Sequence, residues 1–253
     1  MRIIAIANQK GGCAKTTTVV SLAACLAELQ YRVLVIDLDP QANSSRWLGV
    51  DEDQTGAIDL IISNEAIDRF IVTTTISNVS LVNGSQGLAE VEKLLAGKLA
   101  LEGTLSRKLK KLNKEEWDFV LIDTPPTLGL LTINALTAAD ELLVPVTTHV
   151  MTLSGVAQLT STIQNVVDIL NPHLKILGYL PCRFDIRTRH SQEVLESLVG
   201  HFGKAVFQTK IRENIRIAEA PSFRESILSY DPKSSVAQDY RDFAKEVIAR
   251  VAT

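Results

Sequence analysis

The chain has 253 residues, of which 46% are hydrophobic and 22% charged, and its formal net charge is −3. This slight negative charge excludes a strongly basic domain, so any contact with nucleic acid must use a local patch. The longest apolar runs have the length of a strand, far below the roughly 20 residues that a membrane-spanning helix needs.

Three scattered cysteines, Cys13, Cys25 and Cys182, lack the spacing of a disulfide framework or a metal cluster. The opening MRIIAIANQ turns polar too soon for a secretory signal peptide. We therefore expect a cytoplasmic protein.

Short apolar runs rich in β-branched residues alternate along the chain with longer stretches of helical period. In chain order, strands are predicted at 2–7, 32–37, 77–87 (with its loop), 118–123, 141–146, 174–181 and 204–208. Helices are predicted at 15–30, 86–114, 151–170 and 234–253. The strands are apolar on both parities, which is typical of parallel strands covered by helices on each face. The pattern predicts an α/β fold with a single doubly wound, mostly parallel sheet, and one domain over 1–253.

The stretch NQKGGCAKTTT follows the first predicted strand and opens the first predicted helix. At such a junction, backbone N–H groups and the positive end of the helix dipole converge on an anion. Gly11 and Gly12 allow close approach of the backbone. Lys15 is placed to neutralise β- and γ-phosphate oxygens, and the Thr16 hydroxyl to bind Mg²⁺. The stretch therefore predicts a phosphate-binding loop, although the usual pattern has glycine at the positions of Gln9 and Ala14.

A Mg-nucleotide site also needs carboxylates at the ends of neighbouring strands. Asp123 closes the strand FVLID and precedes TPP, which is the Walker B arrangement. Asp39 lies just beyond VLVID, in position to orient or deprotonate an attacking water, and Asp37 stands two residues earlier. A single aspartate at a strand end most simply caps the backbone. Three of them beside a phosphate loop indicate a site that binds a metal ion and an attacking water.

Several sequence blocks resemble the ParA/Soj family of partition ATPases, which are relatives of the MinD proteins. The block KGGCAKTT is similar to the deviant Walker A motif of that family. The likeness spans nearly the whole chain and extends to RVLVIDLDPQAN, DFVLIDTPP, DIRT, NIRIAEAPS and YDPKS. The last two blocks are the more particular to ParA/Soj proteins.

The resemblance gives the second lysine of the loop a role. In such proteins a lysine at the position of Lys10 reaches across a dimer interface to the phosphates of the partner subunit, while Lys15 serves its own nucleotide. A cation supplied in this way acts as an arginine finger does. The resemblance thus implies a homodimer holding two ATP molecules with Mg²⁺, with Lys10, Lys15 and Asp39 as catalytic residues.

The resemblance also implies a set of binding residues. Those implied for the nucleotide are Lys10, Gly11, Gly12, Cys13, Ala14, Lys15, Thr16, Thr17, Asp123, Cys182, Arg183, Arg212 and Asn214. The last four fall in LGYLPCRFD and IRENIR, where the adenine is expected. Those implied for Mg²⁺ are Thr16, Asp39 and Asp123.

ParA/Soj proteins in the ATP state bind DNA without sequence preference, and an adaptor of the ParB type stimulates their hydrolysis. The resemblance implies the same partners here, nucleoid association in the ATP state, and a cargo such as a plasmid, a chromosome origin or a protein body. The basic residues implied for DNA are Arg187, Arg189, Arg216, Arg224 and Lys233. From Arg183 to Lys233, however, nine Lys/Arg face seven Asp/Glu, so DNA binding follows from the likeness more than from charge.

A membrane-positioning ATPase of the MinD type is the main alternative, and it would need a separate basic amphipathic tail. The last predicted helix carries instead an apolar stripe, more simply a face packed on the domain, made of Val236, Tyr240, Phe243, Val247 and Val251. No helix-turn-helix extension is expected ahead of the first strand. An iron-protein-like electron donor would need cluster cysteines, and 26–181 contains none. An amidase of the cobyrinic acid type would need a further catalytic domain.

A nucleotide-dependent binding module without catalysis is a further alternative. Lys15, Thr16, Asp39 and Asp123 argue against lost catalysis. The basic run RKLKKLNK (107–114) is predicted to be the solvated face of a helix, with contact to nucleic acid as the alternative.

Overall fold

One seven-stranded sheet organises the computed structural model, which describes residues 1–51, 55–94, 100–148 and 153–250. The strands are β1 (Arg2–Ile6), β2 (Val33–Asp37), β3 (Val72–Thr73), β4 (Val79–Val82), β5 (Phe119–Asp123), β6 (Glu141–Thr147) and β7 (Lys175–Cys182). Their order across the sheet is β3-β4-β2-β5-β1-β6-β7, and every neighbouring pair is parallel except β3 with β4. The predicted α/β fold with a mostly parallel sheet is confirmed.

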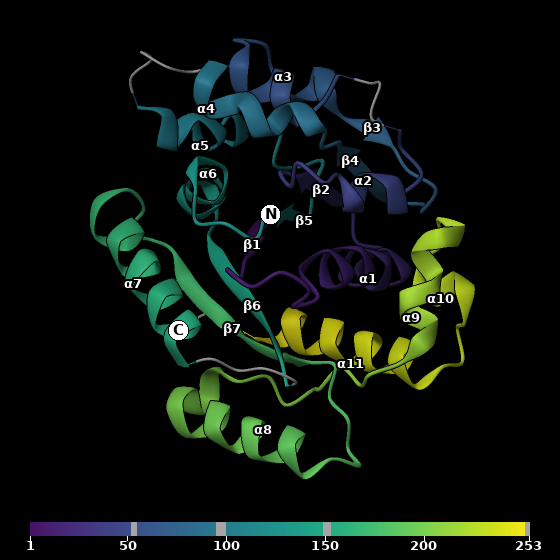
Figure 1. Cartoon of the computed structure of the whole chain (residues 1–253). Coiled ribbons are helices and arrows are strands. Elements are labelled where there is room, and N and C mark those ends of the chain that lie inside the picture. The colour runs from purple at the N-terminus through teal and green to yellow at the C-terminus, as the bar shows by residue number, and fades with distance from the viewer. Residues whose placement is uncertain (52–54, 95–99, 149–152, 251–253) are drawn as a thin grey trace.

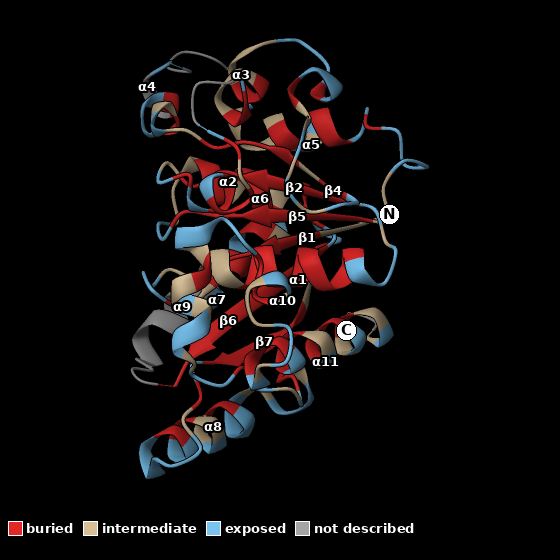
Figure 2. Ribbon diagram, turned by 90° about the vertical axis from the view of Figure 1, so that its right-hand side faces the viewer, coloured by how far each residue is buried: buried red, intermediate tan, exposed pale blue. Residues whose placement is uncertain are grey.

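Helices cover both faces of this sheet (Figures 1 and 2). The α-helices are α1 (Lys15–Glu28), α2 (Asn43–Trp47), α3 (Ala57–Ile62), α4 (Val91–Leu94), α5 (Thr104–Leu109), α6 (Leu130–Ala138), α7 (Leu153–Ile169), α8 (Arg189–Phe202), α9 (Ile215–Glu219), α10 (Ile227–Tyr230) and α11 (Ser235–Ala249). The 3-10 helices are η1 (Ile67–Phe70), η2 (Gln86–Glu90), η3 (Leu101–Gly103), η4 (Gly203–Ala205) and η5 (Ala220–Phe223).

The central strands are apolar on both faces because each face supports a core. Side chains alternate between the two sides of a strand. In β2, Val33 and Val35 pack with residues of α1 and α11, whereas Leu34 and Ile36 pack with residues of α5 and α6. This double burial is why the sequence of these strands shows no polar alternation.

The parallel register brings the C-terminal ends of the central strands together at one edge. Ile6 of β1 and Asp37 of β2 both stand opposite Asp123 of β5. The loop that follows β1 therefore lies beside two aspartates. This edge is where ligands bind in sheets of this kind.

Two predicted elements differ in the structure. Of the helix predicted at 86–114, residues 95–99 lie outside the described part of the chain, and the remainder forms η2, α4, η3 and α5. Gly103 precedes α5, and Ala100 takes a left-handed conformation with φ 55°, so η3 and α5 do not continue one regular helix. The strand predicted at 204–208 is not part of the sheet. Val206 makes only an isolated bridge to Tyr179, at the edge of β7.

Helix α11 packs its apolar stripe into the protein. Val236, Tyr240, Phe243 and Val247 have no exposed surface and share a core with α1, while Val251 lies outside the described residues. The stripe is thus a packing face, as the sequence predicted. Among the described helices, none is both long and apolar enough to cross a membrane.

Candidate functional site

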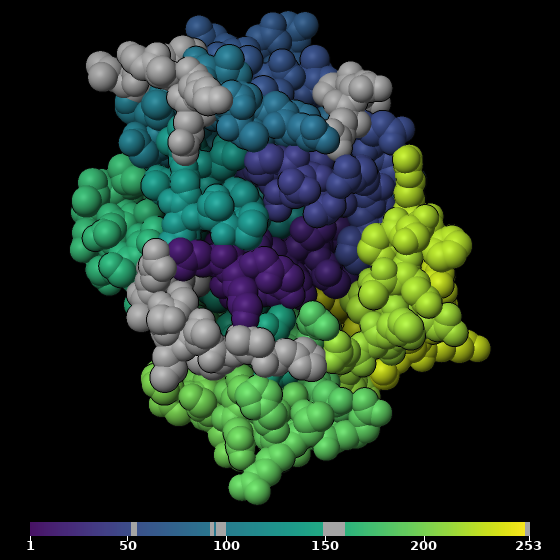
Figure 3. Space-filling model, viewed as in Figure 1, coloured from purple at the N-terminus to yellow at the C-terminus, as the bar shows by residue number. Residues whose placement is uncertain are grey.

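The loop between β1 and α1 lies at the protein surface, where the purple N-terminal segment emerges between later parts of the chain (Figure 3). Gly12 and Ala14 both have left-handed backbones, with φ of 71° and 68°. A Cβ at Gly11 or Gly12 would meet no atom within 4 Å, so this side of the loop has room for a ligand. Ala14 takes the conformation that glycine adopts without strain.

The two lysines of the loop lie in different surroundings. Lys15, the first residue of α1, is 7% exposed, and its charge partly opposes the burial that raises the pKa of Asp123. Lys10 is exposed, and its backbone N–H donates to Asn8 Oδ1 at 3.1 Å. The Asn8 side chain in turn donates to Pro145 O at 2.7 Å, which ties the start of the loop to β6. One lysine is therefore directed into the site and the other lies on the surface.

Asp123 sits at the centre of the site. Its Oδ2 accepts hydrogen bonds from Thr16 Oγ1 at 2.8 Å and from Ser44 Oγ at 2.6 Å. Full burial raises the pKa of Asp123 above its usual range, and the bonds from Ser44 and Thr16 oppose that shift. A positive charge placed beside this carboxylate would stabilise its ionised form.

Asp37 is fully buried, and its carboxylate is occupied by hydrogen bonds from neighbouring residues. Its carboxylate accepts from Ser45 Oγ at 2.7 Å, from Ser45 N at 2.9 Å and from Asp39 N at 3.1 Å. Burial, followed by the nearby charge of Asp123, raises the pKa of Asp37. These bonds fix the segment that carries Asp39, which is 7% exposed and accepts from Gln41 N at 2.9 Å.

Three residues that sequence reasoning missed complete this edge. Ser44 and Ser45 of α2 bind Asp123 and Asp37, and Ser45 Oγ also accepts from Gly84 N at 2.8 Å. A Cβ at Gly84 would lie 2.9 Å from Asp37 Cγ, so only glycine fits there without a shift. The serines stand in the block DPQANSS, but nothing in their local pattern says which aspartate they meet.

The residues implied for adenine gather in one cavity beside the loop. Cys182, Arg183, Arg212 and Asn214 line a space of about 320 Å³ together with Gly12, Ala14 and Thr17. Its wall is held by ion pairs. Arg183 donates to Glu213 Oε1 at 2.8 Å, and the Arg212 guanidinium turns to Asp239 of α11, with a shortest bond of 2.6 Å.

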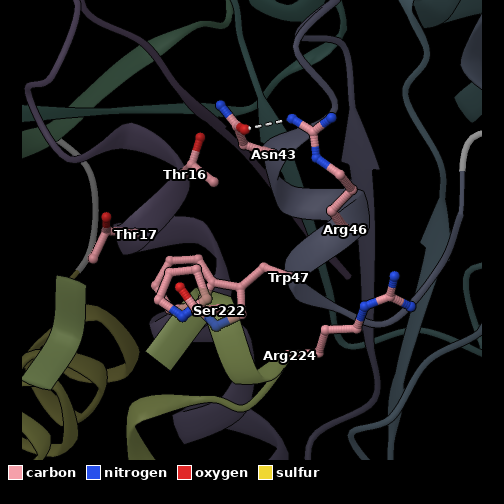
Figure 4. A pocket seen from close by; sticks show the side chains of 8 residues that line it. Thr16, Thr17, Asn43, Arg46, Trp47, Ser222 and Arg224 are labelled. Carbon is pink, nitrogen blue, oxygen red and sulfur yellow. Dashed lines mark hydrogen bonds between the residues drawn. The ribbon is translucent and has the colours of Figure 1, made fainter. Parts of the chain in front are cut away.

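A second hollow of about 480 Å³ also reaches Thr16 and Thr17 (Figure 4). Its other lining residues come from α2 and from the segment around η5. Figure 4 shows the Trp47 ring between these segments and the Arg46 guanidinium bonded to Asn43 Oδ1 at 2.8 Å. Helix α2 thus has one face on the buried aspartates and another on an open hollow.

Comparison with known proteins gives a consistent result. A protein-family model described as an AAA domain matches residues 1–176. The sporulation initiation inhibitor protein Soj of Bacillus subtilis is 41% identical over 98% of both chains. The chromosome-partitioning ATPase Soj of Thermus thermophilus is 42% identical over 99% of this chain and 97% of its own. The chain belongs to the ParA/Soj family of partition ATPases. Among solved structures, that of cobyrinic acid a,c-diamide synthase from Mycobacterium smegmatis with a bound ATP analog and magnesium matches with a TM-score of 0.84. It is 37% identical and covers 97% of this chain and 93% of its own.

The residues of this ParA/Soj protein fit a Mg²⁺ ion. Mg²⁺ prefers oxygen ligands, and Thr16 Oγ1 lies 2.8 Å from a carboxylate oxygen of Asp123. The other oxygen of that group, Asp123 Oδ1, is buried and has no hydrogen-bond partner among the described residues. An unsatisfied buried carboxylate oxygen is costly unless a cation or a bound water compensates it.

The arginines that the ParA/Soj likeness implies for DNA all have acidic neighbours. Arg187 pairs with Asp185 at 2.9 Å and Arg189 with Glu193 at 2.9 Å. The other two pairs are Arg216 with Glu219 at 3.1 Å and Arg224 with Asp51 at 2.8 Å. Lys233 is exposed. The structure therefore brings the four residues implied for adenine beside the loop, whereas it leaves these arginines in locally neutral pairs.

Proposed function

We propose that this ParA/Soj protein dimerises on ATP, binds DNA without sequence preference in that state, and hydrolyses ATP to position a cargo. The two-lysine loop carries the proposal. Lys15 is buried beside Asp123, whereas Lys10 is exposed on the loop surface. One loop thus offers one cation to its own nucleotide and a second to a nucleotide held by another subunit.

Within one subunit, the residues of the site bind phosphate, Mg²⁺, the attacking water and adenine. The N–H groups at the start of α1 and the Lys15 ammonium hold the β- and γ-phosphates. Thr16, with Asp123 and Asp39, would hold Mg²⁺, which neutralises phosphate charge when bound. Asp39 orients the attacking water and accepts its hydrogen bond. The cavity that includes Cys182 and Asn214 takes the adenine.

Dimerisation then depends on the nucleotide by linkage. A Lys10 ammonium reaching the partner's γ-phosphate gains an ionic contact that ADP does not offer, so ATP shifts the equilibrium toward the dimer. The dimer doubles the number of basic residues that can contact DNA phosphates, which raises avidity without any new residue. An adaptor of the ParB type accelerates hydrolysis and returns the protein to the monomer. The ATP form resides on the nucleoid in the cytoplasm.

Two variants test the sandwich. Asp39→Ala should accumulate as a dimer in Mg-ATP, because it removes the group that orients the water and leaves both lysines in place. Lys10→Ala should bind nucleotide with unchanged affinity and stay monomeric, while Lys204→Ala, an exposed lysine on η4, should dimerise normally. Light scattering after size exclusion measures the mass. An Asp39→Ala protein that remains monomeric in Mg-ATP contradicts the proposal.

DNA binding is tested separately on the Asp39→Ala protein with random-sequence duplex, in Mg-ATP and in Mg-ADP. Binding with ATP alone, weakening as salt rises, is the expected result, because phosphate contacts release counterions. Equal binding with both nucleotides would separate DNA from the ATP switch and refute this part of the proposal.

A further inference from the structure

Lys108 of α5 is a buried lysine held by backbone carbonyl groups. Its side chain is 8% exposed, and its ammonium donates to Ser63 O at 2.9 Å and to Glu65 O, both in the segment that follows α3. The Glu65 carboxylate pairs with Arg69, at 2.7 Å. An ammonium group has three N–H donors, so the two carbonyl bonds leave one donor of Lys108 for a further acceptor.

Lys110 and Lys111 add two exposed cations beside this buried one. They lie in the turn that follows α5, where their backbone N–H groups donate to Ser106 O at 3.0 Å and Lys108 O at 3.1 Å. Across the ranges that the structure describes, no ion pair joins either ammonium to a carboxylate. The pKa of Lys108 is lowered by its burial and then by the charge of Lys111. A carboxylate bound near both lysines would offset that repulsion.

These lysines line a cleft of about 380 Å³ between α3 and α5, called here the α3–α5 cleft. Its lining combines cations with partly buried apolar side chains, among them Arg107, Lys108, Lys110, Lys111, Ile62 and Leu101. Of the described residues that line the cleft, none is acidic. The cleft shares no lining residue with the two hollows beside the phosphate loop. It is therefore a positively charged, partly apolar surface separate from the nucleotide site.

The mixed lining indicates the kind of ligand that fits this cleft. Carboxylates can pair with the cations, while Ile62 and Leu101 offer apolar surface that a purely ionic ligand would leave in contact with water. Duplex DNA presents phosphates and has no apolar side chains to place there. Helices α3 and α5 also lie at the opposite end of the molecule from α8, which begins at Arg189 (Figures 1 and 2). A protein segment with both acidic and apolar side chains matches the cleft better than a nucleic acid does.

We propose that the α3–α5 cleft docks a segment of a partner protein in which acidic and apolar side chains alternate. The carboxylates of that segment pair with Lys110, Lys111 and the remaining donor of Lys108, and its apolar side chains pack on Ile62 and Leu101. Because the cleft is separate from the hollows beside the phosphate loop, the partner can stay bound while the nucleotide changes. The cleft is thus an attachment surface that requires neither dimerisation nor DNA binding, and the proposal rests on neither.

The test measures the binding of two fluorescein-labelled peptides by fluorescence anisotropy, with Mg²⁺ and a non-hydrolysable ATP analog present. In the first peptide, pairs of glutamates alternate with pairs of leucines, and in the second, serines replace the leucines. Wild type is compared with Lys110→Gln/Lys111→Gln and with a matched variant, Lys204→Gln/Lys245→Gln, that removes two exposed lysines elsewhere. Each exposed ion pair changes affinity by a factor of about 1.4 to 5, so the loss of two should raise the Kd about 2- to 25-fold.

Weaker binding of the leucine-containing peptide by Lys110→Gln/Lys111→Gln supports the proposal, provided that the matched variant is unaffected and that wild type binds the serine-containing peptide less tightly. Equal weakening in both variants would show that only net charge matters, and equal binding of the two peptides would show a site for simple anions. Either result overturns the proposal, as does the absence of peptide binding to wild type. Affinity for random-sequence duplex is measured on the same three proteins. If Lys110→Gln/Lys111→Gln loses affinity for DNA as much as for the peptide, the cleft belongs to the DNA surface and the proposal is overturned.

Discussion

The Ser45 hydroxyl joins two segments at the C-terminal edge of the sheet, and its removal measures how firmly that edge is held. It donates to Asp37 Oδ2 at 2.7 Å and accepts from Gly84 N at 2.8 Å, and all three residues are buried. In Ser45→Ala the carboxyl loses a donor and the Gly84 N–H loses its acceptor. Water does not reach either group to replace the bond.

The expected cost follows from these two losses. A hydrogen bond of this kind contributes about 1 kcal/mol, and a buried donor left unsatisfied costs about 1–3 kcal/mol. The sum, about 3 kcal/mol, is a large part of the 5–15 kcal/mol that stabilises a typical domain. For a chain of this size, each kcal/mol shifts the Tm by about 2–4 °C, so Ser45→Ala should unfold about 6–12 °C below wild type.

Thermal unfolding followed by circular dichroism, without nucleotide and with a chelator, is the assay. Ser161→Ala is the matched control, because Ser161 is exposed on α7 and its loss should change stability by less than about 0.5 kcal/mol. The double variant with Asp37→Asn should be less destabilised than the two single changes predict together, because they share one bond. A Ser45→Ala protein that unfolds within about 2 °C of wild type would refute this reasoning.

Three further outcomes are expected. Ala14→Gly should raise the free energy of unfolding by about 0.5–1 kcal/mol, because relief of a left-handed alanine outweighs the added freedom of the unfolded chain; a lower urea midpoint would contradict it. Asp37→Asn should flatten the pH dependence of stability. The pKa of Asp37 is raised in the folded protein, so its contribution is present below about pH 4 and is lost as pH rises through the folded pKa. Urea midpoints at several pH values, with a chelator present, measure this. If the midpoint changes with pH as steeply as in wild type, the reasoning is wrong. Glu213→Gln should tighten ATP binding up to about fivefold, because it releases Arg183 and removes a negative charge from the cavity wall. Calorimetric titration decides, and weaker binding would show that the ion pair shapes the cavity.

The sequence by itself determined the features that depend on short stretches of chain. Strand-length runs that are apolar at both odd and even positions predicted parallel strands, and the mostly parallel sheet confirms that prediction. The residues around Lys15 and Thr16 could be predicted as a phosphate loop because strand, turn and helix follow one another within a few positions, and the structure places them between β1 and α1. Asp123 could be placed in the site since it ends a strand, and strand ends of a parallel sheet share one edge.

Only the tertiary structure decided which groups meet across the chain. Ser45 is hydrogen-bonded to Gly84, which lies 39 positions away in the sequence, and Ser44 to Asp123, which lies 79 positions away. These contacts depend on packing that no local sequence pattern encodes. The cations of the basic run look alike in sequence, yet Lys108 is buried against the end of α3 and Lys111 is exposed. Local sequence sets backbone preference and charge, but burial and hydrogen-bond partners depend on the register in which distant segments pack. That register fixes which lysine holds the fold and which remains available to a ligand.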